Sequence, residues 1–185
     1  MSYAIPTNEL TLTDIKTYKQ NAVDAGIKRA LALGIARSIN ELVAREALPA
    51  TDFGAPAGSG YAAERYITGA LAASAWGSVF GTGVAPTMAN NKVAVFYKLG
   101  DSAATPAVAG VRFMVGATGA TTKAVFHIQL PLDNKLESDV YLSEPVVYDP
   151  QDVLFIQCYP RVAIAVGEEL SFGAFIIERL GATVS

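Results

Sequence analysis

Residues 21–39 read NAVDAGIKRALALGIARSI, and small side chains recur in this stretch at every fourth position. They are Ala22, Gly26, Ala30, Gly34 and Ser38. Positions four apart lie on one face of an α-helix, so the spacing predicts a helix with a narrow face free of bulky groups. Such a face lets another backbone approach closely. The partner of this face therefore decides how the chain folds and what it contacts.

We expect this helix to begin near Thr11 or Thr13, either of which can act as the N-cap, with Asp14 in the first turn. Good helix formers continue until Pro49, which excludes the preceding residue from the helical region. About 35 residues would make a rod of roughly 50 Å. The helix either packs across its own domain or forms an arm on neighbouring subunits. We prefer the arm, with the five small residues as its contacts.

The composition indicates that much of the surface is covered. Hydrophobic residues make up 51% of the chain and charged residues only 17%, against about 25% in ordinary soluble chains. The helix holds Lys19, Asp24, Lys28, Arg29 and Arg37, so we do not expect it to cross a membrane. No signal peptide is recognisable, and the net charge of −3 does not favour nucleic-acid binding. We expect a chain made in the cytoplasm and then buried in an assembly.

The rest of the sequence predicts a mainly β domain. Short runs rich in Val, Phe, Ile and Tyr alternate with turns rich in Gly, Pro, Asp and Asn, without helices between them, which is typical of an antiparallel β-sandwich. The runs are residues 92–100, 107–116, 122–130, 138–144, 152–161 and 169–178, with one or two more strands expected within 66–90. The predicted organisation is a helical arm (1–50), a linker (51–65) and a β-sandwich domain (66–185).

Alternation along the strands indicates which faces are buried. In residues 122–130, Ala124, Phe126 and Ile128 share one face, and Lys123 and His127 lie on the other. The last strand differs, because Phe172 and Ile176 face one way whereas Phe175 and Ile177 face the other. Both of its faces need cover. We therefore predict that Phe175 and Ile177 meet either another subunit or the docked helix, and we count them as candidate interface residues.

The sequence offers little for catalysis. It has one histidine, His127, and one cysteine, Cys158, which we expect at the surface and in the core respectively, and it lacks a G-x-S-x-G motif. Gly58 to Ala63 matches G-x-G-x-x-A, but no predicted strand precedes it, so no cofactor is expected. The acidic stretch 132–152 follows no EF-hand spacing, so no metal is expected. We predict a protein that is not an enzyme.

Residues 143–181 read SEPVVYDPQDVLFIQCYPRVAIAVGEELSFGAFIIERLG. This segment resembles the closing strands of jelly-roll-like virion proteins of tailed bacteriophages, the head decoration or cement proteins. In those proteins a DPQD-like turn precedes a paired strand, and a segment like GEELSFGAFIIE closes the sheet. The resemblance covers the C-terminal half of the chain and implies an antiparallel jelly-roll-like β-sandwich preceded by the long N-terminal helix.

The resemblance also implies a function. It points to a structural virion protein that lies on the outside of an icosahedral shell, contacts the major capsid protein or another virion protein, and bridges neighbouring capsid subunits. A homo-oligomer, either a trimer or a dimer, is expected. Two alternatives stay open: a tail or neck component, and a carbohydrate-binding jelly roll. For the latter, Tyr61, Tyr66, Trp76 and Tyr97 are the candidate sugar-stacking residues.

Overall fold

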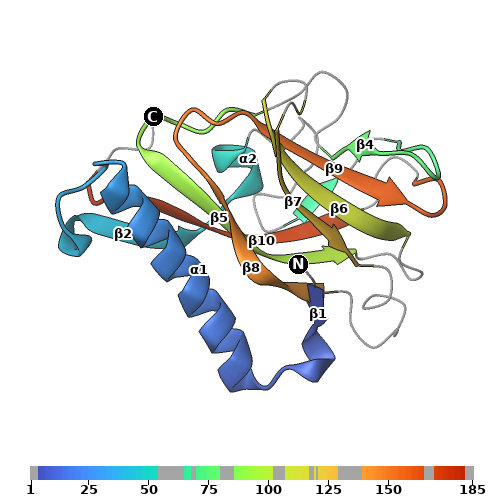
Figure 1. The fold of residues 1–185 in the computed structure, drawn as a ribbon, viewed down its shortest axis with the longest axis horizontal. Helices are drawn as coiled ribbons and strands as arrows, with labels where there is room; N and C mark the ends of the chain where they lie inside the picture. The colour runs from blue at the N-terminus through green and yellow to red at the C-terminus, as the bar shows by residue number, and fades with distance from the viewer. Residues whose placement is uncertain are drawn as a thin grey trace.

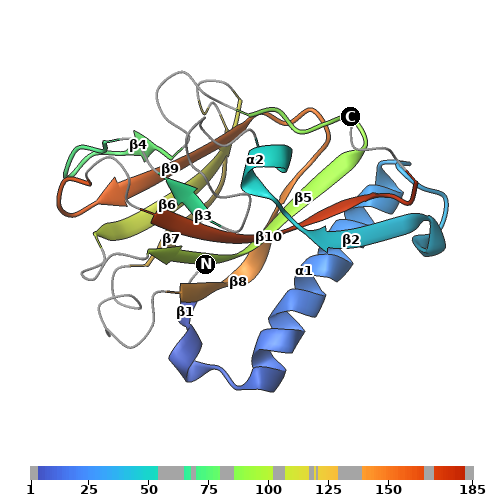
Figure 2. The same ribbon diagram turned by 180° about the vertical axis from the view of Figure 1, so that it is seen from behind.

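The computed structural model describes residues 4–53, 65–67, 70–79, 86–101, 107–116, 119, 121–128, 139–164 and 169–181. Two antiparallel sheets face each other, and one long helix crosses the outer side of the first sheet (Figures 1 and 2). The predicted mainly β sandwich with a preceding helix is confirmed.

Within the described residues, the first sheet has six strands and the second has four. In spatial order the first contains β1 (Ala4–Pro6), β8 (Asp139–Tyr148), β5 (Lys92–Asp101), β10 (Glu169–Arg179) and β2 (Leu42–Glu46), and β3 (Arg65–Ile67) also pairs with β10. The second contains β4 (Gly77–Ser78), β9 (Leu154–Pro160), β6 (Val108–Val115) and β7 (Thr121–His127). The helices in the described part of the chain are α1 (Leu12–Ala32), α2 (Pro49–Asp52) and two 3-10 turns, η1 (Thr7–Glu9) and η2 (Ile39–Glu41).

The pairing of the strands is that of a jelly roll. From β3 to β10, the first strand pairs with the last, β4 with β9, β5 with β8, and β6 with β7, so the pairs are nested. A long antiparallel hairpin that is folded over into two sheets produces this nesting. The β2 strand pairs with residues 175–179 of β10 and β3 with residues 169–171, so the two occupy successive stretches of the same edge.

The core between the sheets is built on aromatic rings. Phe96 of β5 lies at its centre, with its ring centroid 5.3 Å from that of Phe113, 5.4 Å from that of Phe53 and 5.7 Å from that of Tyr148. The Tyr148 hydroxyl donates a hydrogen bond to the carbonyl of Met114, so its one polar group is satisfied inside the core. These rings fix the distance between the two sheets.

The N-terminus of α1 lies where the sequence predicts it. Thr11 is the N-cap, and it forms a capping box in which its hydroxyl accepts a hydrogen bond from Asp14 N–H while the Asp14 carboxylate accepts one from Thr11 N–H. The Thr11 hydroxyl also donates a 2.6 Å hydrogen bond to the Asp14 carboxylate, and this bond, together with the one from Thr11 N–H, lowers the pKa of Asp14.

The C-terminus of α1 lies much earlier than predicted. The helix has 21 residues rather than about 35. Gly34 adopts a left-handed conformation with φ of +72°, its N–H donates to Leu31 O, and Ile35 N–H donates to Ala30 O. This Schellman motif ends the helix, because the left-handed residue turns the chain away from the helix axis. Residues 42–46 then form strand β2 instead of continuing the helix.

The helix packs on the sheet of its own chain. Ala22, Gly26 and Ala30 are buried against a cluster that includes Val95 and Ile177. Of the two alternatives left open by the sequence, the described structure has the helix across its own domain. Residues 1–50 are therefore not a separate arm, because β1 and β2 are strands of the first sheet. Most of the predicted linker lies outside the described residues, and its first two residues belong to α2.

A buried cluster of four charges fixes β2 and α2 to the sheet. The Arg45 guanidinium makes two hydrogen bonds of 2.7 Å to Asp52 and one of 2.8 Å to Glu178, and Lys92 Nζ lies 3.3 Å from Glu178 Oε2. The Asp52 side chain is fully buried. Burial alone would raise the pKa of Asp52, but the hydrogen bonds from Arg45 and Leu48 N–H and the Lys92 charge together lower it.

Replacement of Gly26 by leucine tests the close approach of helix and sheet. A Cβ at this position would lie 2.5 Å from Ile177 Cγ1 and 2.8 Å from Val95 Cγ2. We expect Gly26→Leu to lower the free energy of unfolding by about 1–3 kcal/mol through overpacking. Lys28→Leu introduces the same side chain on the exposed side of α1 and should change the free energy of unfolding by less than about 0.5 kcal/mol. Denaturant titrations that give equal stabilities for the two variants would contradict this packing.

Replacement of Asp52 by asparagine tests the buried charge cluster. Near neutral pH, Asp52→Asn should lower the free energy of unfolding by roughly 3 kcal/mol, because Arg45 and Lys92 would then share the single carboxylate of Glu178. The folded pKa of Asp52 lies below its ordinary value of 3.8, so its stabilisation is present above that value and is lost as the pH falls through the folded pKa. Unfolding curves from pH 7 to about pH 2.5 should show that the difference in unfolding free energy between wild type and variant becomes smaller as the pH falls. A difference that does not depend on pH would contradict the stabilising role proposed for the ionised Asp52.

Candidate functional site

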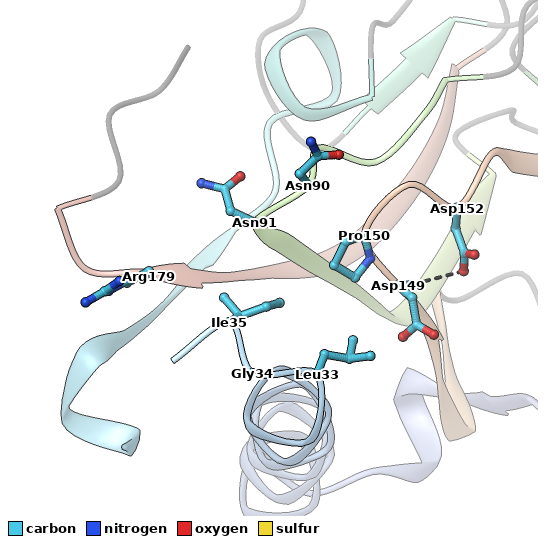
Figure 3. A pocket seen from close by; sticks show the side chains of 9 residues that line it. All are labelled: Leu33, Gly34, Ile35, Asn90, Asn91, Asp149, Pro150, Asp152 and Arg179. Carbon is cyan, nitrogen blue, oxygen red and sulfur yellow. Dashed lines mark hydrogen bonds between the residues drawn. The ribbon is translucent and has the colours of Figure 1, made fainter. Parts of the chain in front are cut away.

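The described surface has an open groove at the end of the sandwich where α1 stops (Figure 3). Its volume is about 610 Å³. Four separate parts of the chain line it: the end of α1, the turn before β5, the turn after β8, and the end of β10. The lining residues are Leu33, Gly34, Ile35, Asn90, Asn91, Asp149, Pro150, Asp152 and Arg179.

The turn after β8 is held in a fixed shape. Asp152 N–H donates to Asp149 O, Asp149 N–H donates to the Asp152 carboxylate, and Gln151 has a φ of +64°. Proline at the second position and a positive φ at the third are the features of a type II turn. Met88 pairs with this turn through two backbone hydrogen bonds, with Asp152 and with Gln151. The wall of the groove is therefore built on a rigid loop.

The charged groups around the groove are paired with one another. Arg29, in the last turn of α1, makes two hydrogen bonds to Asp149, of 2.6 and 2.7 Å, and these lower the pKa of the Asp149 carboxyl. Asp152 lies 3.1 Å from Lys123 Nζ. Arg179 Nη2 lies 3.7 Å from Glu41 Oε2. The groove consequently presents little net charge to a partner.

Apolar side chains surround the groove and remain exposed. Leu33, Ile39 and Leu180 keep 42%, 57% and 64% of their surface accessible. Leu180 N–H donates a hydrogen bond to Glu41 O, which places the end of β10 next to η2. Three of the six large apolar side chains that are exposed in the described residues therefore lie at this end. We call Leu33, Ile39, Leu180 and the groove the end surface.

The structure brings together two sets of residues that the sequence treats as separate interfaces. Ala22, Gly26 and Ala30 of α1 lie over β5 and β10, and Phe175 and Ile177 of β10 face the same side. Phe175 also stacks on Tyr97, with ring centroids 5.0 Å apart. Ala22, Gly26, Ala30 and Ile177 are buried inside one chain and so are not available to a neighbouring subunit, whereas Phe175 is half-buried. The docked helix is what covers the second face of the last strand.

The two remaining stripe residues have different roles. Gly34 is the residue that ends α1, and it lines the groove with open space where a side chain would be. Ser38 is the N-cap of η2 and is exposed. The regular spacing of small residues therefore continues past the end of the helix, and only its first three members share a helical face.

The two residues with the most reactive side chains do not meet. Cys158 is fully buried in the core, and burial raises the pKa of its thiol, with the Asp101 charge adding to the effect. His127 is exposed on β7. Among the described residues no group of three or more His, Cys, Asp or Glu side chains is placed to hold a metal ion. Asp133 and Glu137 of the acidic stretch, and the G-x-G-x-x-A motif at 58–63, lie outside the described residues.

Of the candidate sugar-stacking residues, Tyr97 is inaccessible. It is 2% exposed under α1, and its hydroxyl donates to the Glu46 carboxylate at 3.2 Å. Trp76 is half-buried and immediately precedes β4. Tyr66 lies in β3, and Tyr61 falls outside the described residues. Trp76 is therefore the candidate whose described surroundings allow contact with a ligand.

The end surface itself is not anticipated by the sequence analysis. Its parts come from positions 33–41, 90–91, 149–152 and 179–180, which only the jelly-roll topology brings together. Local signals were nevertheless present. Gly34 followed by an apolar residue is a helix stop, Asn90-Asn91 is a turn, and Asp149-Pro150 begins one.

Comparison with protein-family models finds no family that matches this chain, and comparison with curated proteins likewise finds no match. In the described part of the chain, no helix is both long enough and apolar enough to span a membrane.

Removal of the Arg29–Asp149 pair tests how the groove is held. Arg29 is about half exposed, so we expect Arg29→Gln to cost only about 0.5 kcal/mol of unfolding free energy, an effect that salt should reduce. Chemical denaturation at low and high ionic strength measures both quantities. Lys28→Gln, one residue away on the exposed side of α1, is the matched control. If the loss of unfolding free energy is the same at high and low salt, Arg29 does not stabilise the protein through its ion pair with Asp149.

Proposed function

We propose that this chain is a non-enzymatic structural protein of a tailed-bacteriophage virion, which decorates the capsid and stabilises it by bridging neighbouring capsid subunits. The observation that carries the proposal is the end surface, where exposed leucine and isoleucine side chains surround an open groove whose charges are already paired. The resemblance of residues 143–181 to decoration proteins supplies the class of partner.

The fold is compatible with this function but does not select it. Jelly rolls occur both in viral capsid proteins and in lectin domains, and a fold alone does not imply a function. What supports a binding role is the surface. Exposed apolar side chains gathered near a groove are a feature of interaction sites.

The contact we propose is driven by apolar burial. Complete burial of each leucine or isoleucine contributes about 1.5–3 kcal/mol. Leu33 follows α1, Ile39 begins η2 and Leu180 follows β10, so the three side chains come from three parts of the chain at the same end. The paired charges around the groove make the contact insensitive to salt, because no net charge has to be screened. Binding of this kind suits a particle that must stay intact when the ionic strength changes.

Repetition would strengthen weak single contacts. On a shell, or in a dimer or trimer of this chain, engagement of one copy raises the effective concentration of the next contact. Ala22, Gly26 and Ala30 of the helix stripe have no part in this scheme, because they are covered by the chain's own sheet. The end surface replaces the stripe as the proposed contact with a capsid subunit.

A particle-incorporation assay tests the proposal. We expect the double variant Leu33→Asp with Leu180→Asp to lose at least tenfold in occupancy on density-purified particles from the source of the chain, because two charges would be buried in an apolar contact. Leu12→Asp is the matched control, since Leu12 is 69% exposed at the opposite end of α1. It should incorporate like the wild type.

The position of the protein on the particle is measured by immunogold labelling in electron microscopy. Label spread over the head is the expected result. Label confined to the tail or neck would support the alternative of a tail or neck component. Particles that carry no wild-type protein, or equal occupancy by the double variant and the wild type, would contradict the proposal.

A further inference from the structure

The outer face of the second sheet carries side chains that the core does not use. Leu154, Ile156 and Cys158 of β9 point into the core and are fully buried, so Phe155, Gln157 and Tyr159 point outward. In β6 the inward residues are Val111 and Phe113, and Gly110, Arg112 and Met114 face out. The helix α1 lies on the other sheet and does not cover this face (Figures 1 and 2).

Trp76 lies on this face in a defined orientation. The Arg112 guanidinium carbon lies 4.4 Å from the centre of the indole, and the Tyr159 ring meets it edge-on with centroids 5.5 Å apart. A side chain at Gly110 would begin 3.4 Å from Trp76 Cη2, so the absence of one leaves room for the indole against the sheet. Three neighbours therefore hold a half-buried tryptophan in place before any ligand arrives.

Planar polar groups lie beside the indole. Arg112 Nε donates a 2.6 Å hydrogen bond to Gln157 Oε1, across the register in which Arg112 faces Gln157. Within the described residues this is the one hydrogen bond of Arg112, so its terminal N–H groups are left for another acceptor. His127 is paired with Gly110 on the adjacent strand and is exposed. The donors and the aromatic rings thus form one patch.

The described strands give the patch a positive charge. None of the residues in β4, β6, β7 and β9 is an aspartate or a glutamate. Lys123 of β7 is neutralised by Asp152 at 3.1 Å, whereas Arg112 is paired with an uncharged amide. A carboxylate is the group that a guanidinium with available N–H donors binds best.

We propose that this patch binds an acidic oligosaccharide, with a sugar ring packed on Trp76 and Tyr159, a sugar carboxylate on Arg112, and a hydroxyl on Gln157. Aromatic rings present a flat apolar surface with polar groups at the edge, which suits the mixed apolar and polar faces of a pyranose. This site is separate from the end surface, and the experiment below tests it independently of the proposed virion function.

The chain contains a single tryptophan, so its fluorescence reports on this patch alone. The experiment titrates the full chain with hexasaccharides of galacturonate, mannuronate and guluronate and with sialylated oligosaccharides, and compares them with neutral hexasaccharides of glucose and galactose. We expect a saturable change in Trp76 fluorescence with at least one acidic sugar, at an affinity at least tenfold above that of its neutral counterpart.

Variants assign the response to the patch. Arg112→Gln keeps the tryptophan and should weaken binding of the acidic sugar at least tenfold, as expected for loss of a charge-assisted contact. Arg37→Gln removes an exposed arginine beyond the end of α1 and should bind like the wild type. Circular dichroism checks that both variants fold, and Gln157→Leu serves as a second variant if Arg112→Gln does not. No saturable response to any acidic sugar, equal binding of neutral sugars, or full affinity in folded Arg112→Gln would each overturn the proposal.

Discussion

The contact between Gly26 of α1 and the side chains of Val95 and Ile177 governs how the whole chain is arranged. A helix that carries a small-residue face can lie close to a sheet, and this closeness buries the second face of β5 and β10. Both central strands of the first sheet are therefore apolar on both sides, which explains much of the high hydrophobic content without any partner. Because the helix is docked, the end of α1 and the turns beside it form a fixed surface at one end of the sandwich.

The strands of the jelly roll could be predicted closely because alternation and turn residues are local signals. The expected strands at 92–100, 107–116 and 169–178 differ from β5, β6 and β10 by one residue at most at each end. The predicted length of the helix is wrong. The sequence analysis assigns Gly34 to the stripe of small residues, but a glycine followed by an apolar residue is also a signal for the end of a helix, and Gly34 has the left-handed conformation of such an end. The β2 strand was missed for the same reason. Its pairing with β10 and the ion pair of Arg45 with Glu178 are non-local, so no short window of sequence reveals them.

The functional surfaces were predicted less well than the fold. The small-residue spacing correctly indicated a close partner, but it could not say whether that partner belonged to the same chain, and the same ambiguity applied to Phe175 and Ile177. Trp76 was singled out by residue type alone. Arg112, Gln157 and Tyr159 were not, because they become its neighbours only through the register of β6 and β9. The end surface depends on four chain segments that the topology gathers.

The central claim is that α1 belongs to its own domain and that the end surface, not the helix stripe, faces outward. Hydrogen exchange followed by mass spectrometry on the full chain, at several protein concentrations, tests this most directly. The predicted result is strong protection of amides in residues 15–30, comparable with that of residues 93–97, at every concentration. Rapid exchange in residues 15–30 at low concentration, with protection gained only as the chain self-associates, would mean that the helix is an intersubunit arm and would contradict the account.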